Sequence, residues 1–417
     1  MFDIAAICLT LTAVLAYFNH RFVRLPMAIG VMVIALLLSL GIIALARLGI
    51  AAELLRHEEL FVRSIDFSDV LMRGMLSLLL FAGALHVDLS ALKSYRWQIG
   101  ALALVGTSAS TLVVGFGMWF ALPWIGIGLP LVYCLLFGAL ISPTDPIAVI
   151  GIMRTAGAPR NLELVIAGES LFNDGVGVVL FALLLSVALQ GSWPGTGAAA
   201  TLLLQEAGGG IVFGLVLGWI TNRMLKSIDE YQVEVLLTLA AVMGGYALAN
   251  HLHVSGPLAM VVCGLMVGNA GRSHAMSDVT RKYVDMFWEL IDSILNAVLF
   301  VLIGLEVLLV EFSVSLLVAG LLAVVVTLIA RALTVGLPVR VLCSHFRLPP
   351  GSSSVLTWGG LRGGISVALA LSLTNSDSAP AARETILALT YCVVVFSVLV
   401  QGLTIGRVVR HRVLDRS

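Results

Sequence analysis

Long apolar runs constrain this chain more than any other feature. They are about 17–25 residues long, the length that an α-helix needs to cross a bilayer, and they follow one another along most of the 417 residues. Because backbone polar groups in lipid must be paired within the chain, such runs fold as membrane helices. The sequence therefore predicts an all-α polytopic membrane protein of about thirteen transmembrane helices. They fall at 3–19, 25–46, 69–87, 98–121, 130–152, 161–189, 201–224, 232–250, 254–270, 284–309, 313–340, 352–374 and 384–406.

The placement of charge predicts how the helices are oriented. The chain is 59% hydrophobic and only 12% charged, more apolar than a soluble domain. Most of its 24 Lys and Arg residues fall in loops on one predicted side, and the other side holds only Arg47, Arg56, Arg63, Arg73 and Arg383. By the positive-inside rule, the N-terminus lies outside and the C-terminus in the cytoplasm. We therefore expect a multi-pass protein of the plasma (inner) membrane, whose first apolar run is retained and whose mixed segment 50–66 lies amphipathically at the surface.

Two of the runs contain residues through which a helix cannot continue. The fifth carries Ser142-Pro143-Thr144-Asp145-Pro146, where each proline removes a donor and keeps the preceding residue out of the helical region. The twelfth carries Gly359-Gly360-Leu361-Arg362-Gly363. If the seventh run, 201–225, is a linker, residues 1–190 and 230–410 form two repeats of opposite orientation, each broken at its fifth helix. Interrupted helices paired in this way are typical of the midplane binding site of a secondary transporter, so we interpret the chain as one transporter domain.

The sixth run carries ionisable residues at membrane depth. Ser170 and Asp174 are four residues apart and share one helix face, while Glu169 and Asn173 share the adjacent face. A charge at that depth costs several kcal/mol (roughly 2.5–3.5), so an intramembrane carboxylate is a functional-site hypothesis by default.

The candidate ligands point to a small hard cation. Asp174, Ser170 and Asn173, with Thr144 and Asp145 from the first break, offer carboxylate, hydroxyl, amide and carbonyl oxygens. A buried carboxylate also holds a proton readily. One site that binds either a cation or a proton, but never both, is sufficient for cation/proton exchange. We expect such an exchanger to need no cofactor beyond the transported ions.

The remaining charged residues have structural interpretations. Glu169 needs a cationic partner. Arg331 and Arg362 are the only Lys or Arg residues well inside the runs, away from their ends, and the residues alone leave the choice between them open. Arg362 either offsets facing helix-dipole ends or supports the region of Asp145. Asp145 itself either joins the ion site or caps the half-helix that follows Pro146.

The motifs resemble a known family. Gly168-Glu169-Ser170-Leu171-Phe172-Asn173-Asp174-Gly175 looks like the signature of bacterial NhaP-type sodium/proton antiporters, which are relatives of the mammalian sodium/proton exchangers in the monovalent cation/proton antiporter superfamily. The resemblance covers nearly the whole chain in the expected order. Its other motifs are the two breaks, Phe300-Val301-Leu302-Ile303-Gly304-Leu305-Glu306 and Ile329-Ala330-Arg331.

The resemblance implies roles for individual residues. Asp174 would bind the cation or proton, and Na⁺ would be held at Asp174, Ser170 and the Thr144 carbonyl, with Asp145 beside it. Asn173, in place of an aspartate, is similar to the electroneutral branch, which exchanges one cation for one proton. Glu169 would form a structural salt bridge with Arg331.

The resemblance also implies an assembly and a physiological setting. The fold would be the two-repeat antiporter fold of the NhaA and NapA type in a homodimer. The fourth to sixth and eleventh to thirteenth helices would form a core that moves against a dimerisation domain of helices one to three and eight to ten. The implied activity is Na⁺(Li⁺)/H⁺ antiport in pH homeostasis, with K⁺/H⁺ exchange on the same fold as the rival.

Two other classes of protein fit less well. An intramembrane aspartyl hydrolase would use a pair of aspartates that share one proton, but the Asp145-Pro146 break and the Asn173-Asp174 pair suit an ion site better. A passive channel would favour a ring of repeated pore residues, which the sequence does not show. One departure from the family concerns the third helix, where some relatives carry a glutamate that joins the ion site. Here Leu78–Asp88 holds no carboxylate before its end.

Overall fold

The computed structural model describes residues 2–48, 74–190, 197, 201, 204–271, 276–306, 313–341, 348–373 and 380–413. Within these ranges the chain is helical and contains no strand, which confirms the predicted all-α class. Nine helical stretches in the described part are long and apolar enough to cross a membrane, and three shorter apolar helices accompany them. The predicted amphipathic segment at 50–66 lies outside the described residues.

Each of the thirteen apolar runs contains helix. In the first half the main elements are α1 (Phe2–Phe18), α2 (Met27–Arg47), α5 (Leu76–Leu85), α8 (Thr107–Ala121), α9 (Leu131–Ile141), α10 (Ile147–Ala156) and α11 (Arg160–Gln190). In the second they are α13 (Gly209–Leu225), α14 (Tyr231–His251), α15 (Gly256–Met266), α17 (Asp278–Glu306), α18 (Val314–Arg331), α21 (Ser352–Trp358), α22 (Gly364–Leu371), α23 (Pro380–Phe396) and α24 (Leu403–Arg412). Short helices α6 (Leu89–Lys93), α7 (Arg96–Gly100) and α19 (Leu337–Val341) lie between them.

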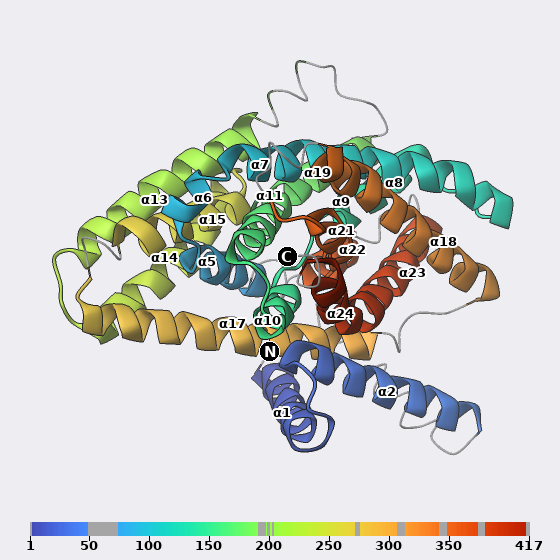
Figure 1. Ribbon diagram of the computed structural model, residues 1–417, viewed down its shortest axis with the longest axis horizontal. Coiled ribbons are helices and arrows are strands. Elements are labelled where there is room, and N and C mark those ends of the chain that lie inside the picture. The colour runs from blue at the N-terminus through green and yellow to red at the C-terminus, as the bar shows by residue number, and fades with distance from the viewer. Residues whose placement is uncertain are drawn as a thin grey trace.

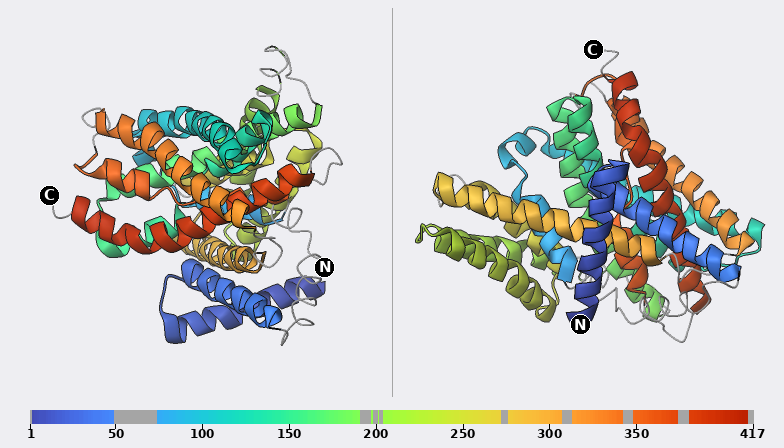
Figure 2. Two further views of the ribbon diagram at one scale, coloured as in Figure 1. Left: turned by 90° about the vertical axis from the view of Figure 1, so that its right-hand side faces the viewer. Right: turned by 90° about the horizontal axis from the view of Figure 1, so that it is seen from below.

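The helices pack in two neighbouring groups. In one, α8 packs on α9 and α18, α11 packs on α9, α18 packs on α23, and α24 contacts α10 and α21. In the other, α15 packs against α5, α13 and α14. The long helix α17 contacts both groups, and α1 and α2 lie along its outer side (Figures 1 and 2). The predicted division into a core and a dimerisation domain stays a prediction.

Both predicted breaks are present, and they lie near the centre of the molecule. The chain leaves the helix after Ile141 and re-enters it at Ile147, and it does so again between Trp358 and Gly364. The broken helices α9/α10 and α21/α22 are surrounded by α11, α18, α23 and α24 (Figure 1).

A glycine in α11 lets the first break lie directly on that helix. A Cβ atom at Gly177 would overlap the ring of Pro143. Glycine is therefore required there by packing, and the contact fixes the distance between the break and the polar face of α11.

Candidate functional site

The two breaks are joined to each other through the backbone. The Asp145 N–H donates to the Leu361 carbonyl oxygen over 2.8 Å. Backbone groups in an interrupted helix must find partners inside the protein, and here part of each break supplies the partner of the other.

Arg362 holds the end of the first half-helix. It is 2% exposed, and its Nη1 donates to the carbonyl oxygens of Ser142 and, over 2.8 Å, Pro143. These are carbonyls that a helix leaves unpaired at its C-terminal end, where a positive charge is favourable. The Arg362 backbone N–H donates to Ser397 Oγ over 2.9 Å, and that hydroxyl donates to Gln401 Oε1 over 2.8 Å. Arg362 thus links the two breaks to the last long helical stretch.

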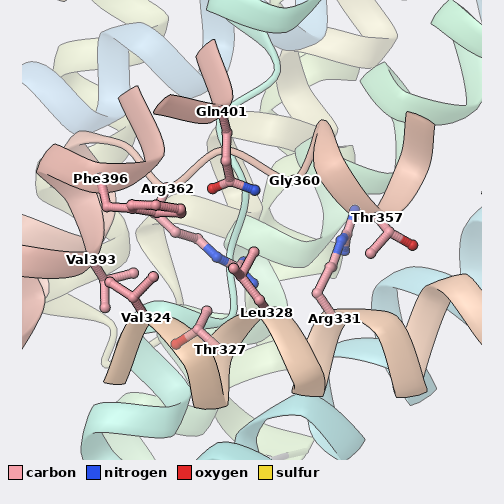
Figure 3. Close-up of a pocket in the computed structure, with 10 residues that line it drawn as sticks. All are labelled: Val324, Thr327, Leu328, Arg331, Thr357, Gly360, Arg362, Val393, Phe396 and Gln401. Carbon is pink, nitrogen blue, oxygen red and sulfur yellow. The ribbon is translucent and has the colours of Figure 1, made fainter. Parts of the chain in front are cut away.

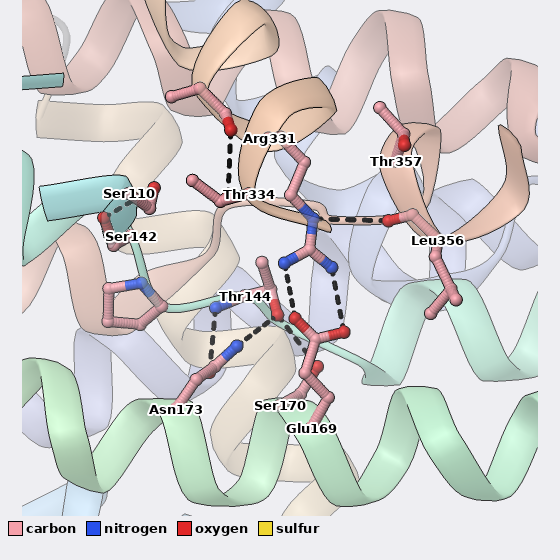
Figure 4. Close-up of polar contacts among 12 residues, drawn as sticks. Ser110, Ser142, Thr144, Glu169, Ser170, Asn173, Arg331, Thr334, Leu356 and Thr357 are labelled. Atoms are coloured by element: carbon pink, nitrogen blue, oxygen red, sulfur yellow. Dashed lines mark hydrogen bonds and ion pairs between the residues drawn. The ribbon is translucent and has the colours of Figure 1, made fainter. Parts of the chain in front are cut away.

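The polar face of α11 braces the first break from the other side (Figure 4). The Thr144 N–H donates to Asn173 Oδ1 over 3.2 Å, and Asn173 Nδ2 donates to Thr144 Oγ1 over 2.8 Å. The Thr144 hydroxyl also shares a hydrogen bond of 2.9 Å with the Ser170 hydroxyl. All three residues are buried. Asn173 therefore binds Thr144 through both the oxygen and the nitrogen of its side-chain amide, and it thereby holds the first break against α11.

Glu169 and Arg331 form a bidentate ion pair (Figure 4). Arg331 Nη1 and Nη2 contact the two carboxylate oxygens, the second over 3.0 Å, and Nε donates to the Leu356 carbonyl over 3.2 Å. Glu169 is only 1% exposed. The choice that the residues alone left open is answered by the contacts, with Arg331 against Glu169 and Arg362 against the carbonyls of the first break.

The two arginines also line one small cavity (Figure 3). Its volume of about 10 Å³ is close to what a single water needs. Arg331 reaches it from the end of α18 and Arg362 from the second break, with Thr327 and Gln401 among the other lining residues. Two positive charges therefore lie near each other in the protein interior, close to the Glu169 carboxylate of α11.

Asp174 lines a larger cavity on the other side of the break. The cavity has a volume of about 210 Å³ and is lined by Asp174 of α11, by Thr144 and Asp145 of the first break, and by Gly363 of the second. Asp174 is 7% exposed. A Cβ atom at Gly363 would overlap the Asp145 carboxylate, so the glycine lets that carboxylate lie directly against the second break. The two aspartates predicted for the ion site are thus brought to one cavity.

The third apolar run contributes no carboxylate to this cavity in the described residues. Its helix α5 supplies Leu79, Leu80 and Gly83, and His86 follows directly after it. Asp88 instead caps α6, where Oδ1 accepts from the N–H of Ser90 over 2.8 Å. The additional hydrogen bond from the Ser90 hydroxyl is the main reason why the pKa of Asp88 lies below its ordinary value.

Sequence reasoning missed several residues that build the site. Ser397 and Gln401 support Arg362, and their spacing of four residues in an apolar run was a usable signal. The Leu361 carbonyl and Gly363 could not be singled out from a glycine-rich stretch, since their roles depend on which segment lies opposite. Ser366, in the first turn of α22, also lines the large cavity.

These features define a class. Two interrupted helices bonded at their breaks, with two carboxylates lining a cavity beside them, are the architecture of a secondary ion transporter.

Comparisons with known proteins narrow the class to a family. The family model described as sodium/hydrogen exchanger, transmembrane, matches residues 9–411. The chain is 54% identical over 416 residues to the Na⁺/H⁺ antiporter NhaP of Pseudomonas aeruginosa, covering 99% of this chain and 97% of the relative. It is 35% identical over 411 residues to the Na⁺/H⁺ antiporter NhaH of Halobacillus dabanensis, covering 94% of this chain and 98% of the relative. The chain belongs to the sodium/hydrogen exchanger family.

A solved structure shares the fold. The sodium proton antiporter MjNhaP1 from Methanocaldococcus jannaschii, determined at pH 8, superposes with a TM-score of 0.76 at 21% identity. The alignment covers 97% of this chain and 96% of that one. The predicted antiporter fold is thereby confirmed.

Proposed function

We propose that this chain is a secondary active transporter that exchanges one Na⁺ or Li⁺ for one proton at Asp174. The observation that carries the stoichiometry is the balance of charge at the crossing of the breaks. Counted over the two breaks and the stretches of α11 and α18 beside them, there are three carboxylates, Asp145, Glu169 and Asp174, and two guanidinium groups, Arg331 and Arg362. With every group ionised the sum is one negative charge, and a single Na⁺ or a single proton cancels it.

The balance matters because an uncancelled charge in a protein interior within a membrane is costly. A core that carries net charge resists movement through the apolar centre of the membrane, whereas a neutral core does not. The transporter would therefore move with either ligand bound and not with an empty or doubly occupied site. This is the condition for obligatory one-for-one exchange by alternating access.

The proposed Na⁺ site uses the Asp174 carboxylate, the Ser170 hydroxyl and the Thr144 carbonyl, with Asp145 beside it. Oxygen ligands of these types suit a small hard cation. Asn173 is occupied by its two hydrogen bonds to Thr144, so we assign it a bracing role next to the site. Glu169 with Arg331, and Arg362 with the carbonyls of the first break, form the scaffold.

The proposed setting follows from the charge distribution and the family. The protein would reside in the plasma (inner) membrane with its N-terminus outside and its C-terminus in the cytoplasm, as a homodimer. It would need no cofactor besides the ions that it transports. The names of both relatives favour Na⁺ as the cation, and no observation favours the K⁺/H⁺ rival.

The test is proton flux in everted vesicles that carry a pH gradient. Addition of Na⁺ or Li⁺ should dissipate the gradient with the wild-type protein, and K⁺ should not. Asp174→Asn should abolish the response, while Asp229→Asn, at an exposed loop position, should leave it intact. Circular dichroism of the purified variants checks that both fold. Wild-type exchange in a folded Asp174→Asn variant would overturn the assignment, and dissipation by K⁺ alone would establish the rival.

A further inference from the structure

Ser366 carries a buried hydroxyl whose purpose the scaffold does not explain. It is 1% exposed, and within the described part of the chain its Oγ has no hydrogen-bond partner. Leaving a buried polar group unpaired is unfavourable. The hydroxyl of Ser372, the residue directly after α22, donates to the Leu369 carbonyl over 2.7 Å. Of these two nearby serines, therefore, only Ser366 has a hydroxyl without a partner.

Ser366 lies at the proposed ion-binding cavity. Ser366 lines the same cavity of about 210 Å³ as Asp174 and Asp145. It lies in the first turn of α22, which begins directly after Gly363, and Gly363 leaves the room that the Asp145 carboxylate occupies.

Other polar side chains around the cavity already have partners. His86 Nδ1 bonds to the Ala82 carbonyl over 2.8 Å. Asn296 Nδ2 donates to the carbonyl and to Oδ1 of Asp292 over 2.8 and 3.1 Å. The Thr144 hydroxyl is engaged by Asn173 and Ser170. Ser366 thus offers both lone pairs and a rotatable hydrogen to whatever occupies the cavity.

We propose that Ser366 Oγ is a further oxygen ligand of the transported cation, supplied by the second interrupted helix. This inference rests on the exchange site proposed above and deepens it. A hydroxyl suits both states of the exchange cycle, because its oxygen coordinates Na⁺ and its hydrogen-bonding groups pair with Asp174 when that carboxyl holds the proton. Ligands would then come from the first break, from α11 and from the first turn of α22, so that cation binding draws three elements together.

The experiment measures Na⁺-dependent proton flux by the full-length protein in proteoliposomes at a fixed pH of about 8. Three variants are compared with wild type: Ser366→Ala, Ser366→Cys and Ser372→Ala. Cysteine keeps the volume but replaces the hard oxygen with a soft sulfur, and Ser372→Ala, directly after the same helix, is the matched control. We expect both Ser366 variants to raise the KM for Na⁺ about tenfold, which corresponds to about 1.4 kcal/mol of binding. Their maximal rates should change less than the KM, and the control should behave as wild type.

A stability measurement separates a ligand from a merely structural residue. Since removal of an unpaired hydroxyl takes away a burial penalty, the midpoint of thermal unfolding of Ser366→Ala without Na⁺ should equal or exceed that of wild type. The gain in midpoint on adding Na⁺ should shrink.

The inference is overturned if the KM of both Ser366 variants stays within twofold of wild type, if Ser372→Ala raises the KM equally, or if only the maximal rate falls. Its failure is distinguishable from failure of the proposed function. If exchange depends on Asp174 and not on Ser366, this inference alone is wrong, whereas exchange that is independent of Asp174 rejects the site itself.

Discussion

Removing one partner of the Glu169–Arg331 pair should destabilise the protein by about 3–5 kcal/mol, the usual cost of leaving a buried charge unpaired. The contacts that each substitution removes predict which variant loses more unfolding free energy within that range. Arg331→Leu leaves a carboxylate that is 1% exposed without its two donors, and it also frees the Leu356 carbonyl. We expect this variant near the upper end. Glu169→Gln keeps the bond from Arg331 Nε to Leu356, so we expect it near the lower end.

The double variant Glu169→Leu/Arg331→Leu should be more stable than either single change, because an apolar pair of similar volume replaces a buried ion pair at little net cost. Glu163→Gln is the matched control. It removes the 3.5 Å pair with Arg154, whose side chain is 72% exposed, and such exposed pairs contribute about 0–1 kcal/mol.

The assay is unfolding of the purified protein in a titration with SDS, followed by circular dichroism, together with the KM for Na⁺ in proteoliposomes. The free energy of unfolding should fall as ranked, while the KM of the folded variants stays within about threefold of wild type. Single variants as stable as the control would show that the pair does not hold the fold. A KM that collapses in a stable variant would show that the pair belongs to the ion site.

Other predictions concern the packing of the breaks and the charge that moves. Gly363→Ala places a methyl group on the Asp145 carboxylate, and since such overpacking costs about 1–3 kcal/mol, exchange should slow at least tenfold. The control is Gly151→Ala, because a Cβ atom there meets no other atom within 4 Å. Equal exchange rates in the two variants would contradict the packing at Gly363. Gly177→Ala should push Pro143 away from α11 and lower both the thermal midpoint and the rate, so an unchanged midpoint would argue against the contact. Clamping the membrane potential at different values should leave the exchange rate unchanged, and a rate that follows voltage would rule out one-for-one exchange.

The apolar helices and the positions at which two of them are interrupted were predictable from the sequence. Prolines on both sides of Thr144-Asp145 and four glycines around Arg362 break a helix for local steric reasons, so the two interruptions are present where they were expected. The apolar runs likewise predict helices, because lipid leaves the backbone no other arrangement.

The contacts between distant segments were not predictable from the residues alone. Two arginines were available for Glu169, and only the folded chain shows that Arg331, at the end of α18, is the one that reaches the carboxylate. Arg362 meets carbonyl oxygens, which leave no mark in a sequence because every residue has one. Asn173 illustrates the same limit, since its role as a brace depends on a Thr144 backbone that has left the helix.

The central claim is that one cation and one proton compete for a single net charge at Asp174. It is tested most directly by the apparent KM for Na⁺ in proteoliposomes between about pH 6 and 9. Below the pKa of the site, proton competition should raise the KM about tenfold for each pH unit, while the maximal rate at saturating Na⁺ changes far less. A KM that does not change with pH would contradict the account, because it would mean that Na⁺ and the proton bind at separate sites.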